Sequence, residues 1–388
     1  MENGTRKFLI IAGEASGDNH AARVVRELKV LFPDADFFGA AGPKMRDAGV
    51  RDVVRSDDFG IIGLPEVAKA LPMFLRARRD LLNAAKSERP DVAILVDFPE
   101  FNLKIARSLK KQGISVVYYI SPQIWAWRAY RIRSIRRNVD LLLTILPFEK
   151  DWYAERGIHH VEYVGNPLAR EVNATEEKAG FCQRHGIDAS RPIVALLPGS
   201  RHKEIVRILP ELLGTAARML RVNASLQFVI AFAYEKHRGE LDAALAMLDE
   251  DERLNLREIK SVFSETYNAL NAADAAAVTS GTATLETGII GVPMVIVYKS
   301  TALNYRLLRP LIRVEHFGLI NLIAERRIAT ELIQDDLTPE KLSAELFRLL
   351  DPDTNTKTRE ELKAAADKLG HGGASERAAV AIQKLIEK

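Results

Sequence analysis

The chain has 388 residues, of which 47% are hydrophobic, so it can bury a substantial core and is expected to form two domains. A net charge of only +3, with acids and bases interspersed, excludes the global positive field of a typical nucleic-acid-binding protein. The single cysteine, Cys182, cannot form an intrachain disulfide, which fits a reducing compartment. No apolar run approaches the roughly 18 residues of a membrane span, and no signal peptide is recognisable. We therefore expect a soluble, cytoplasmic protein.

Short apolar runs alternate with segments of helical period along the first half of the chain. The runs predicted as strands are 8–12, 37–41, 92–96, 115–120, 141–146 and 161–165. This alternation is typical of a parallel sheet that is covered by helices on both faces.

The alternation of apolar runs and helical segments resumes after a polar stretch at 166–175. From about Thr338 the pattern is helical only. The second set of predicted strands is 192–197, 226–232, 275–280 and 293–298. We therefore predict an α/β protein with two parallel-sheet domains, at 1–168 and 169–350, and C-terminal helices at 351–388 that pack back on the first domain.

Ligands of open α/β sheets bind at the carboxyl ends of the strands, so the loops that follow strands are the first places to search. The first strand leads into AGEASGD, residues 12–18. Its glycines let a substrate approach the backbone, and Asp18 is placed to cap a helix that opens at Asn19. The spacing is not GxGxxG, so a dinucleotide site is not expected, and a capped turn without a ligand stays an alternative. The side chains that could make polar contacts with a substrate are those of Glu14, Ser16 and Asp18.

A second loop, DFPEFN at 97–102, follows the strand VAILV. Pro99 suits the first turn of a helix, so Asp97 either caps that helix or acts as a general base in a site partly desolvated by phenylalanines. Glu100 and Asn102 are close enough in sequence to orient it. A glycosidase-like carboxylate pair of Asp97 and Glu100 is a poorer interpretation, because this spacing does not determine their separation.

The third segment, SPQIWAWRAYRIRSIRR at 121–137, combines Trp125 and Trp127 with several arginines. Stacking on nucleic acid bases, an amphipathic surface on anionic lipid, and a helix with a buried tryptophan and a solvated basic face all fit the pattern. The segment is short and the chain carries no comparable patch, so we do not expect a nucleic-acid partner.

Two loops of the second half carry residues suited to an anion. In PGSRHKEI, residues 198–205, Gly199 and Ser200 lead into a helix whose first turn contains Arg201. Free N–H groups, the helix dipole and a guanidinium group together favour phosphate. The Walker pattern GxxxxGK[ST] is absent, and an empty capped turn stays an alternative.

The other loop, SGTATLE at 280–286, also opens a helix. Gly281 removes the side chain where an anion would press on the backbone, and Ser280 and Thr282 can donate hydrogen bonds to phosphate oxygens. Glu286 lies four residues after Thr282 on the same face, where it would repel phosphate but accept hydrogen bonds from ribose hydroxyls. This predicts a nucleoside diphosphate across the helix start, against the alternative of a capped helix with an incidental glutamate.

A metal site is not expected. Asp34 and Asp36 have the DxD spacing, but they precede their predicted strand and so lie at the wrong end of the sheet. No cofactor is expected either.

Six motifs in register, from about residue 8 to about residue 350, closely resemble the lipid-A-disaccharide synthase family of inverting glycosyltransferases. They are AGEASGD, DFPEFN, SPQIWAWR, LPFEKDWY, LLPGSR and SGTATLE. The resemblance implies a GT-B fold in which two Rossmann-like halves face a central cleft, with the nucleotide on the C-terminal half and the acceptor on the N-terminal half. It also implies transfer of 2,3-diacylglucosamine from its UDP ester to 2,3-diacylglucosamine 1-phosphate, giving a β-1,6-linked disaccharide 1-phosphate and UDP without a metal.

The resemblance also assigns roles to residues. Asp97 matches a base that deprotonates the acceptor hydroxyl, Arg201 and Glu286 match residues associated with UDP, and Asn321 matches an asparagine needed for activity. We expect the nucleotide at Gly199, Ser200, Arg201, Ser280, Gly281, Thr282, Glu286 and Asn321. We expect the acceptor or donor sugar at Glu14, Ser16, Gly17, Asp18, Asn102 and Trp125. The chain departs from the family pattern at Phe98, Glu100, Asn166 and Ile320.

Acylated substrates imply contact with a membrane, so we expect peripheral attachment to the inner membrane. Segments 71–82 and 303–317 mix apolar residues with arginines and suit an anionic interface, although solvated amphipathic helices would show the same pattern. Family members are reported as dimers, so a homodimer is a further expectation. Two rival functions are a peptidoglycan-type UDP-GlcNAc transferase, to which GNP at 165–167 gives slight support, and a non-catalytic nucleotide- or RNA-binding protein.

Overall fold

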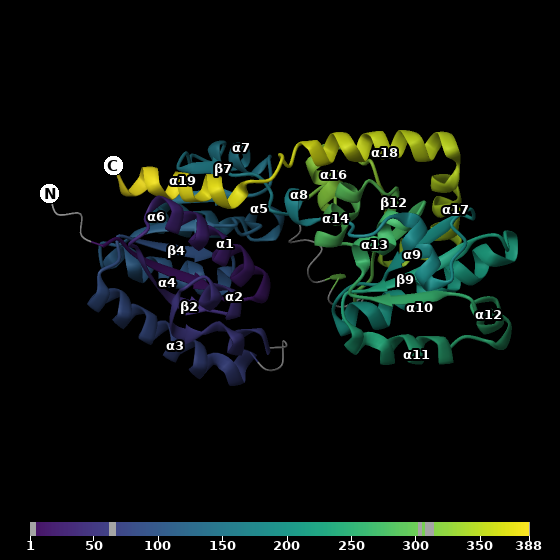
Figure 1. The fold of residues 1–388 in the computed structure, drawn as a ribbon, viewed down its shortest axis with the longest axis horizontal. Helices are drawn as coiled ribbons and strands as arrows, with labels where there is room; N and C mark the ends of the chain where they lie inside the picture. Colours follow the sequence, from purple (N-terminus) through teal and green to yellow (C-terminus); the bar gives the residue numbers. More distant parts are fainter. Residues whose placement is uncertain (1–4, 62–66, 302–304, 307–313, 388) are drawn as a thin grey trace. The chain divides into compact units, whose positions relative to one another are not determined.

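The computed structural model describes residues 5–61, 67–301, 305–306 and 314–387. The chain divides into two compact units, which are coloured along the sequence in Figure 1. The first unit contains Met1–Pro167 and His371–Lys388, and the second contains Leu168–Gly370. Each unit is built on its own parallel sheet.

The first unit has a seven-stranded sheet in the order β3-β2-β1-β4-β5-β6-β7. Every neighbouring pair of strands is parallel. The strands are β1 (Lys7–Ala12), β2 (Asp36–Ala41), β3 (Arg51–Arg55), β4 (Val92–Val96), β5 (Ser115–Tyr119), β6 (Leu141–Thr144) and β7 (Val161–Tyr163).

Helices cover both faces of this sheet. They are α1 (Ala15–Leu31), α2 (Pro43–Asp47), α3 (Val67–Glu88), α4 (Pro99–Lys111), α5 (Ile124–Trp127), α6 (Ile132–Asn138), α7 (Glu149–Ala154) and α19 (Ala374–Ile386). Along β1, Phe8 and Ile10 enter the core beneath α1 and α19, whereas Leu9 and Ile11 enter the core beneath α3 and α4. Because both faces are covered, the strand is an uninterrupted apolar run.

The second unit has a six-stranded parallel sheet in the order β10-β9-β8-β11-β12-β13. Its strands are β8 (Ile193–Leu197), β9 (Gln227–Phe232), β10 (Lys260–Phe263), β11 (Ala275–Thr279), β12 (Met294–Tyr298) and β13 (Thr330–Ile333). Its helices are α8 (Leu168–Glu171), α9 (Lys178–His185), α10 (His202–Val222), α11 (Arg238–Ala246), α12 (Glu250–Asn255), α13 (Thr266–Ala272), α14 (Thr282–Ile290), α16 (Leu319–Ala324), α17 (Pro339–Leu350) and α18 (Pro352–Asp367).

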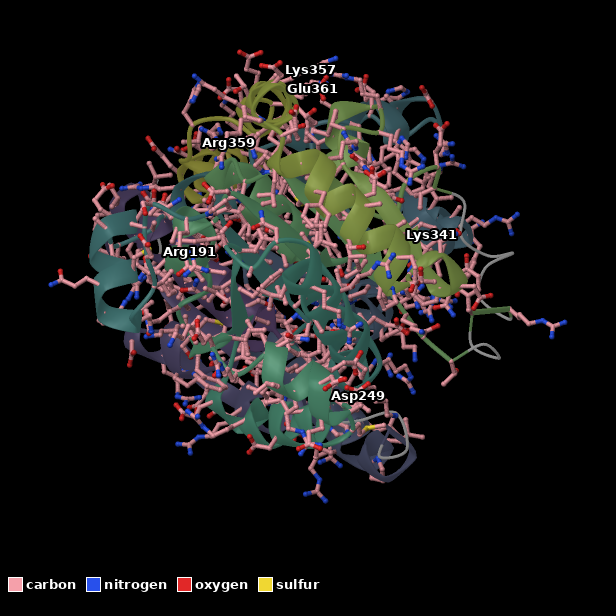
Figure 2. The ribbon with its side chains drawn as sticks, turned by 90° about the vertical axis from the view of Figure 1, so that its right-hand side faces the viewer. Arg191, Asp249, Lys341, Lys357, Arg359 and Glu361 are labelled. Atoms are coloured by element: carbon pink, nitrogen blue, oxygen red, sulfur yellow. The ribbon has the colours of Figure 1, made fainter. Side chains whose placement is uncertain are left out.

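The C-terminal helices are shared between the two units. Helix α18 packs on α14, α16 and α17 of the second unit, and only α19 packs on α1 of the first unit. Arg359 of α18 holds this position by donating hydrogen bonds to Gly291 O at 2.8 Å and to Asn355 Oδ1 at 2.8 Å. Figure 2 labels Arg359 together with the exposed Lys357 of the same helix. The expected return of the chain to the first domain therefore begins after residue 370 rather than at residue 351.

The expected α/β class with two parallel, Rossmann-like sheets is confirmed, and each strand predicted from an apolar run is present. Strands β3, β10 and β13 were not predicted. All three lie at sheet edges, where their half-exposed positions accept polar residues and interrupt the apolar pattern. Among the helices of the described residues, none has the length and apolar character needed to span a bilayer.

Candidate functional site

The strand order of the second unit reverses beside β8, which pairs with β9 on one side and β11 on the other. Such a reversal leaves a crevice at the carboxyl ends of the two diverging strands, where α/β proteins bind ligands. Leu197 ends β8 and lies opposite Val278 of β11. The loops that follow these strands are the two that the sequence assigned to a nucleotide.

These loops form one pocket of about 320 Å³. Seven of its lining residues were predicted for the nucleotide, namely Gly199, Ser200, Arg201, Ser280, Gly281, Thr282 and Glu286. The other lining residues are Leu197, Glu204, Ala231, Ala233, Thr266, Thr279 and Ala283. The fold thus brings together two segments that lie about 80 residues apart in the sequence.

Two helices start at this pocket, and neither start is capped by a side chain. Arg201 occupies the N-cap position of α10, and Gly281 occupies that of α14. The first N–H groups of a helix have no partner within the helix, and the helix dipole places partial positive charge there. Two such ends at one pocket are chemically suited to an anion.

Both glycines of the pocket have backbone angles that favour glycine. The φ angle is 111° at Gly199 and 144° at Gly281. A Cβ atom at position 199 would also lie 3.0 Å from Oε2 of Glu204. A Cβ atom at position 281 would have no neighbour within 4 Å, so only the backbone angle requires glycine there.

The pocket holds charges of both signs. Arg201 has a mostly exposed side chain and pairs with Glu204, one turn into α10, at 2.9 Å. Glu286 is half-buried and accepts a 3.1 Å hydrogen bond from the hydroxyl of Tyr267. Burial raises the pKa of Glu286, and the Tyr267 hydroxyl partly offsets that effect. A carboxylate in this position can accept hydrogen bonds from neutral hydroxyls of a ligand, as the sequence predicted for a ribose.

Asn321 does not line the pocket. It is fully buried, its amide nitrogen donates to Ala329 O at 2.8 Å and to Glu331 Oε1 at 2.9 Å, and its oxygen accepts from the N–H groups of Ile328 and Ala329. All hydrogen-bonding positions of the amide are therefore used inside the protein. Its contribution to the site is indirect.

A chain of hydrogen bonds connects Asn321 to the pocket through Glu331. The Glu331 carboxylate accepts the N–H groups of Phe317 at 2.9 Å and Gly318 at 2.8 Å. The carbonyl of Phe317 in turn accepts the hydroxyl of Ser280 at 3.0 Å. The Ser280 proton is thus directed at the protein rather than at the pocket, which differs from the donor role that the sequence predicted.

The first unit has an equivalent reversal of strand order, between β1 and β4. The loops after these strands are the predicted Gly13–Asp18 and Asp97–Asn102 segments. They interlock, because a Cβ atom at Gly13 would lie 2.3 Å from the Phe98 ring. Only glycine at position 13 leaves room for that ring.

Asp97 and Phe98 adopt an unusual backbone conformation between β4 and α4. Both have positive φ angles, 46° and 49°, which non-glycine residues rarely adopt and which cost free energy. The N-cap of α4 is Phe98 and no side chain caps the helix, so Asp97 does not have the capping role considered above. The strained turn instead fixes the direction of the Asp97 carboxylate at the end of the strand.

Two buried side chains hold the main chain of this turn. The Asn102 amide donates to the carbonyls of Val96 at 3.1 Å and Asp97 at 2.8 Å. The hydroxyl of Tyr118 donates to the same Asp97 carbonyl at 2.6 Å. Asn102 is fully buried, so it orients Asp97 through the backbone and does not itself face a ligand.

The pKa of Asp97 is raised to about 6. Burial is the main cause, the negative charge of Glu14 adds to it, and the N–H of Phe98 opposes it. A carboxylate with this pKa is mostly ionised at neutral pH yet more basic than a solvated aspartate, which suits a general base.

The first loop divides into exposed and structural residues. Glu14 and Ser16 are exposed, and Gly17 is buried beside Val96. Asp18 does not cap its own helix, which begins at Ala15 rather than Asn19. Its buried carboxylate instead accepts hydrogen bonds at the start of α2, from the N–H groups of Gly42, Lys44 and Met45 at 3.0, 2.8 and 3.1 Å.

Trp125 is also part of the core. It is 6% exposed, packs edge-on against Phe148, and donates its indole N–H to Glu149 at 3.1 Å. Burial raises the pKa of Glu149 to about 7 despite this bond and those from main-chain N–H groups. The basic side chains Arg128 and Arg131 of the same segment pair with Glu100, so Glu100 does not pair with Asp97 as a second catalytic carboxylate would.

The four departures from the family pattern have identifiable surroundings. Phe98 packs with Phe59, Phe74 and Phe101 in an aromatic cluster. Glu100 has the arginine partners just described. Ile320 is fully buried against Gly288, and Asn166 is 1% exposed.

Several residues of the two sites were not found from the sequence. Glu204 and Thr266 line the pocket of the second unit, Glu331 supports it, and Tyr118 supports Asp97. Of these four residues, only Glu204 could have been predicted from the sequence, because it lies one turn after Arg201 in the loop assigned to the nucleotide. The others come from strands or helices without a motif, and tertiary packing alone brings them to the site.

Within the described ranges, no group of three or more His, Cys, Asp or Glu side chains is arranged to hold a metal ion. Segment 303–317 lies largely outside these ranges. For segment 71–82, which belongs to α3, the structure leaves Leu71 and Leu75 exposed beside Arg76 and Arg79.

Comparison with known proteins places the chain in a family. Residues 8–385 match the family model described as lipid-A-disaccharide synthetase. The chain is 39% identical over 388 residues to the lipid-A-disaccharide synthase of Geobacter sulfurreducens, covering 100% of this chain and 99% of the relative. It is 43% identical over 386 residues to that of Syntrophus aciditrophicus, covering 99% of both chains.

Solved structures share the fold at low sequence identity. The calicheamicin glycosyltransferase CalG4 gives a TM-score of 0.57 at 14% identity, covering 99% of both chains. A Neisseria meningitidis UDP-GlcNAc 2-epimerase bound to UDP-GlcNAc gives 0.61 at 12%, covering 98% of this chain and 100% of that chain. Two parallel Rossmann-like sheets in one chain, as in these proteins, are the GT-B type of fold. Together with the nearly full-length sequence matches, this shows that the chain belongs to the lipid-A-disaccharide synthase family of glycosyltransferases.

Proposed function

We propose that the chain transfers 2,3-diacylglucosamine from its UDP ester to the 6-hydroxyl of 2,3-diacylglucosamine 1-phosphate, forming a β-1,6-linked disaccharide 1-phosphate and UDP. The observation that carries the proposal is the second unit's pocket, where two uncapped helix starts, Arg201 and Glu286 meet. Family membership supplies the identity of the substrates, and the chemistry of the pocket fits a nucleoside diphosphate.

In this proposal the second unit binds the donor. The N–H groups at the starts of α10 and α14 stabilise the negative charge of the pyrophosphate, which increases as the bond between C1 and the UDP oxygen breaks. Arg201 adds a full positive charge, and Glu286 accepts hydrogen bonds from the ribose hydroxyls. These groups stabilise the leaving group without requiring a cation.

The first unit supplies the base. Asp97 takes the proton of the acceptor hydroxyl as that oxygen attacks C1 on the face opposite UDP, so the new C–O bond forms while the old one breaks and the configuration inverts. The electron pair of the broken bond leaves with UDP. The raised pKa of Asp97 and its strained turn both support this role.

The test measures UDP release from UDP-2,3-diacylglucosamine with and without the acceptor, in excess chelator, for the parent chain and Asp97→Asn. We expect acceptor-dependent release that chelator leaves unchanged and that Asp97→Asn reduces by about 10²- to 10⁴-fold. Full activity of the variant would contradict the role of Asp97, and loss of turnover in chelator would contradict the metal-free mechanism. Replacing the acceptor by a peptidoglycan-type lipid acceptor tests the nearest rival function, and salt-dependent oligonucleotide binding without UDP release would support the non-catalytic one.

We also propose that the enzyme works at the cytoplasmic surface of the inner membrane, which its acylated substrates require. Exposed Leu71 and Leu75 beside the arginines of α3 support an anionic lipid interface. Replacing both leucines by Glu should reduce co-sedimentation with vesicles that contain phosphatidylglycerol. Val222→Glu, at an exposed apolar residue of the second unit, is the matched control and should bind like the parent. Equal binding of all three proteins would contradict this surface. The homodimer also remains a prediction, which a measurement of the molar mass in solution by light scattering would test.

A further inference from the structure

His237 lies beneath the first phosphate-side loop of the pocket, at the end of a short 3₁₀ turn before α11. It is 4% exposed and does not line the pocket. Its Nε2 lies 3.1 Å from the main-chain oxygen of Ser200, and its Nδ1 lies 3.0 Å from Oε1 of Glu240. No sequence motif pointed to either His237 or Glu240.

Both partners of the His237 ring are hydrogen-bond acceptors. A carbonyl oxygen only accepts hydrogen bonds, and so does an ionised carboxylate. Glu240 is ionised, because hydrogen bonds from His202 and His237 lower its pKa to about 2. The Ser200 carbonyl can only accept, so Nε2 of His237 carries a proton and donates it to that oxygen.

The hydrogen bond from His237 to the Ser200 carbonyl also determines the orientation of the peptide group between Ser200 and Arg201. In a trans peptide the C=O and the following N–H point in opposite directions. Because the Ser200 carbonyl points to His237, away from the pocket, the N–H of Arg201 points to the opposite side, where Ser200 and Arg201 line the pocket. A flipped peptide would instead turn a carbonyl oxygen toward the phosphates and repel them.

We propose that His237, held by Glu240, is a positioning residue for the donor: its buried imidazole donates to the Ser200 carbonyl and so holds the Ser200–Arg201 peptide with its N–H toward the pyrophosphate. This inference rests on the proposed UDP site. It adds a group outside the pocket that controls recognition of the phosphates and leaves recognition of the nucleoside unaffected.

The surrounding charges are accounted for by other pairs. His202 of α10 shares the Glu240 carboxylate at 2.9 Å and is mostly exposed. Glu204 pairs with Arg201 at 2.9 Å, and Arg238 pairs with Glu235 at 2.8 Å. Lys236 is exposed and lies over the Tyr234 ring. Among the described neighbours, Glu240 is therefore the carboxylate that faces the His237 ring.

The test compares the binding of UDP and uridine by calorimetry and competition for the parent, His237→Gln, His237→Leu and the control His159→Gln, an exposed histidine of the first unit. We expect His237→Leu to weaken UDP binding roughly 10- to 100-fold, the effect of losing a hydrogen bond to a charged group. Uridine binding should not change. His237→Gln, which can still donate to Ser200, should lose less UDP affinity, and His159→Gln none.

Unchanged UDP binding by His237→Leu would overturn the inference. Equal losses for UDP and uridine would also overturn it, because they would indicate general damage to the fold. Failure of the parent chain to bind UDP would contradict the proposed function itself, so the two failures are distinguishable. If His237→Leu does not fold, nitrogen-15 spectra of the parent provide the test: a protonated Nε2 at His237 supports the inference, and an unprotonated Nε2 contradicts it.

Discussion

Asn102 donates a 2.8 Å hydrogen bond from its buried side-chain amide to the main-chain carbonyl of Asp97. The proposed base is therefore held through its backbone, in a turn whose positive φ angles are unfavourable without such support. Tyr118 donates to the same carbonyl from β5, so strand and helix together determine where the carboxylate points.

Replacing Asn102 by Ala should lower activity mainly through kcat. The carbonyls of Val96 and Asp97 lose a buried donor, so the turn relaxes and the carboxylate moves from its productive position. The free energy of unfolding should fall by about 1–3 kcal/mol. Steady-state kinetics and urea unfolding measure the two effects. Asn83→Ala, at an exposed position on α3, is the control and should change neither. An unaltered kcat in Asn102→Ala would show that the bond does not position the base.

Replacing Asp97 by Asn should make the protein more stable at alkaline pH although it lowers the activity. The folded-state pKa of Asp97 is raised to about 6, above the value of about 3.9 in the unfolded chain. Between these values the folded state binds more protons, so this group's contribution to stability falls as pH rises through that window. A shift of this size corresponds to about 3 kcal/mol, which solvent screening of the half-buried group reduces to about 1–2 kcal/mol.

Urea unfolding of Asp97→Asn and the parent at pH 4 and pH 8 checks this prediction. The variant should be more stable than the parent at pH 8, and the difference should be smaller at pH 4. Asparagine tolerates positive φ angles well, so the turn itself is preserved. A variant that is less stable at pH 8 would show that the Asp97 carboxylate is favourably bound in the fold.

Glu14→Gln should move the acidic limb of the pH–rate profile to lower pH. The negative charge of Glu14 helps to raise the pKa of Asp97, so removing that charge lowers the pKa and keeps the base ionised in more acidic solution. The profile of kcat/KM between pH 4.5 and 8 measures the shift, in a range chosen around the value of about 6. Glu27→Gln makes the same charge change about three turns further along α1 and should leave the limb in place. A shift to higher pH, or no shift, would mean that the limb does not report Asp97.

Gly281→Ala should weaken UDP binding and destabilise the protein by about 1–3 kcal/mol. The cost comes from the backbone angle of 144° at the start of α14, since no atom blocks the added methyl group. Gly239→Ala is the matched control, because that glycine lies in α11 without a positive φ angle and also has open space around it. Thermal unfolding and calorimetry with UDP compare the two. Equal tolerance of both substitutions would contradict the requirement for glycine at position 281.

Glu286→Gln should reduce UDP affinity by roughly tenfold, because an amide accepts ribose hydroxyls less well than a carboxylate does. To test whether the contact is to the ribose, the affinities of the parent and the variant are also measured for 2′-deoxy-UDP and 3′-deoxy-UDP. If the carboxylate binds the ribose, at least one deoxy ligand should bind the parent and the variant almost equally well. The same loss with UDP and both deoxy ligands would place the contact elsewhere on the nucleotide.

The central strands and the motif loops are properties of the sequence itself. A strand such as β1 is buried on both faces, so each of its residues must be apolar and the run is visible without a structure. The loops that begin α4, α10 and α14 were found because proline and glycine restrict the backbone at helix starts in recognisable ways. The edge strands β3, β10 and β13 carried no such pattern, because each has a neighbouring strand on one side only and its half-exposed positions accept polar residues.

Tertiary structure alone decided which polar groups are free to meet a ligand. Asp18, Asn102, Trp125 and Asn321 were predicted to contact ligands, yet each forms hydrogen bonds with main-chain or carboxylate groups inside the protein. Conversely, His237 and Glu331 belong to no motif, yet they support the pocket through hydrogen bonds to the main chain of its surrounding loops. A hydrogen bond joins atoms that are close in space, whereas a motif records residues that are close in the chain. The sequence therefore identified the pocket's loops, and only the folded chain assigned their supporting partners.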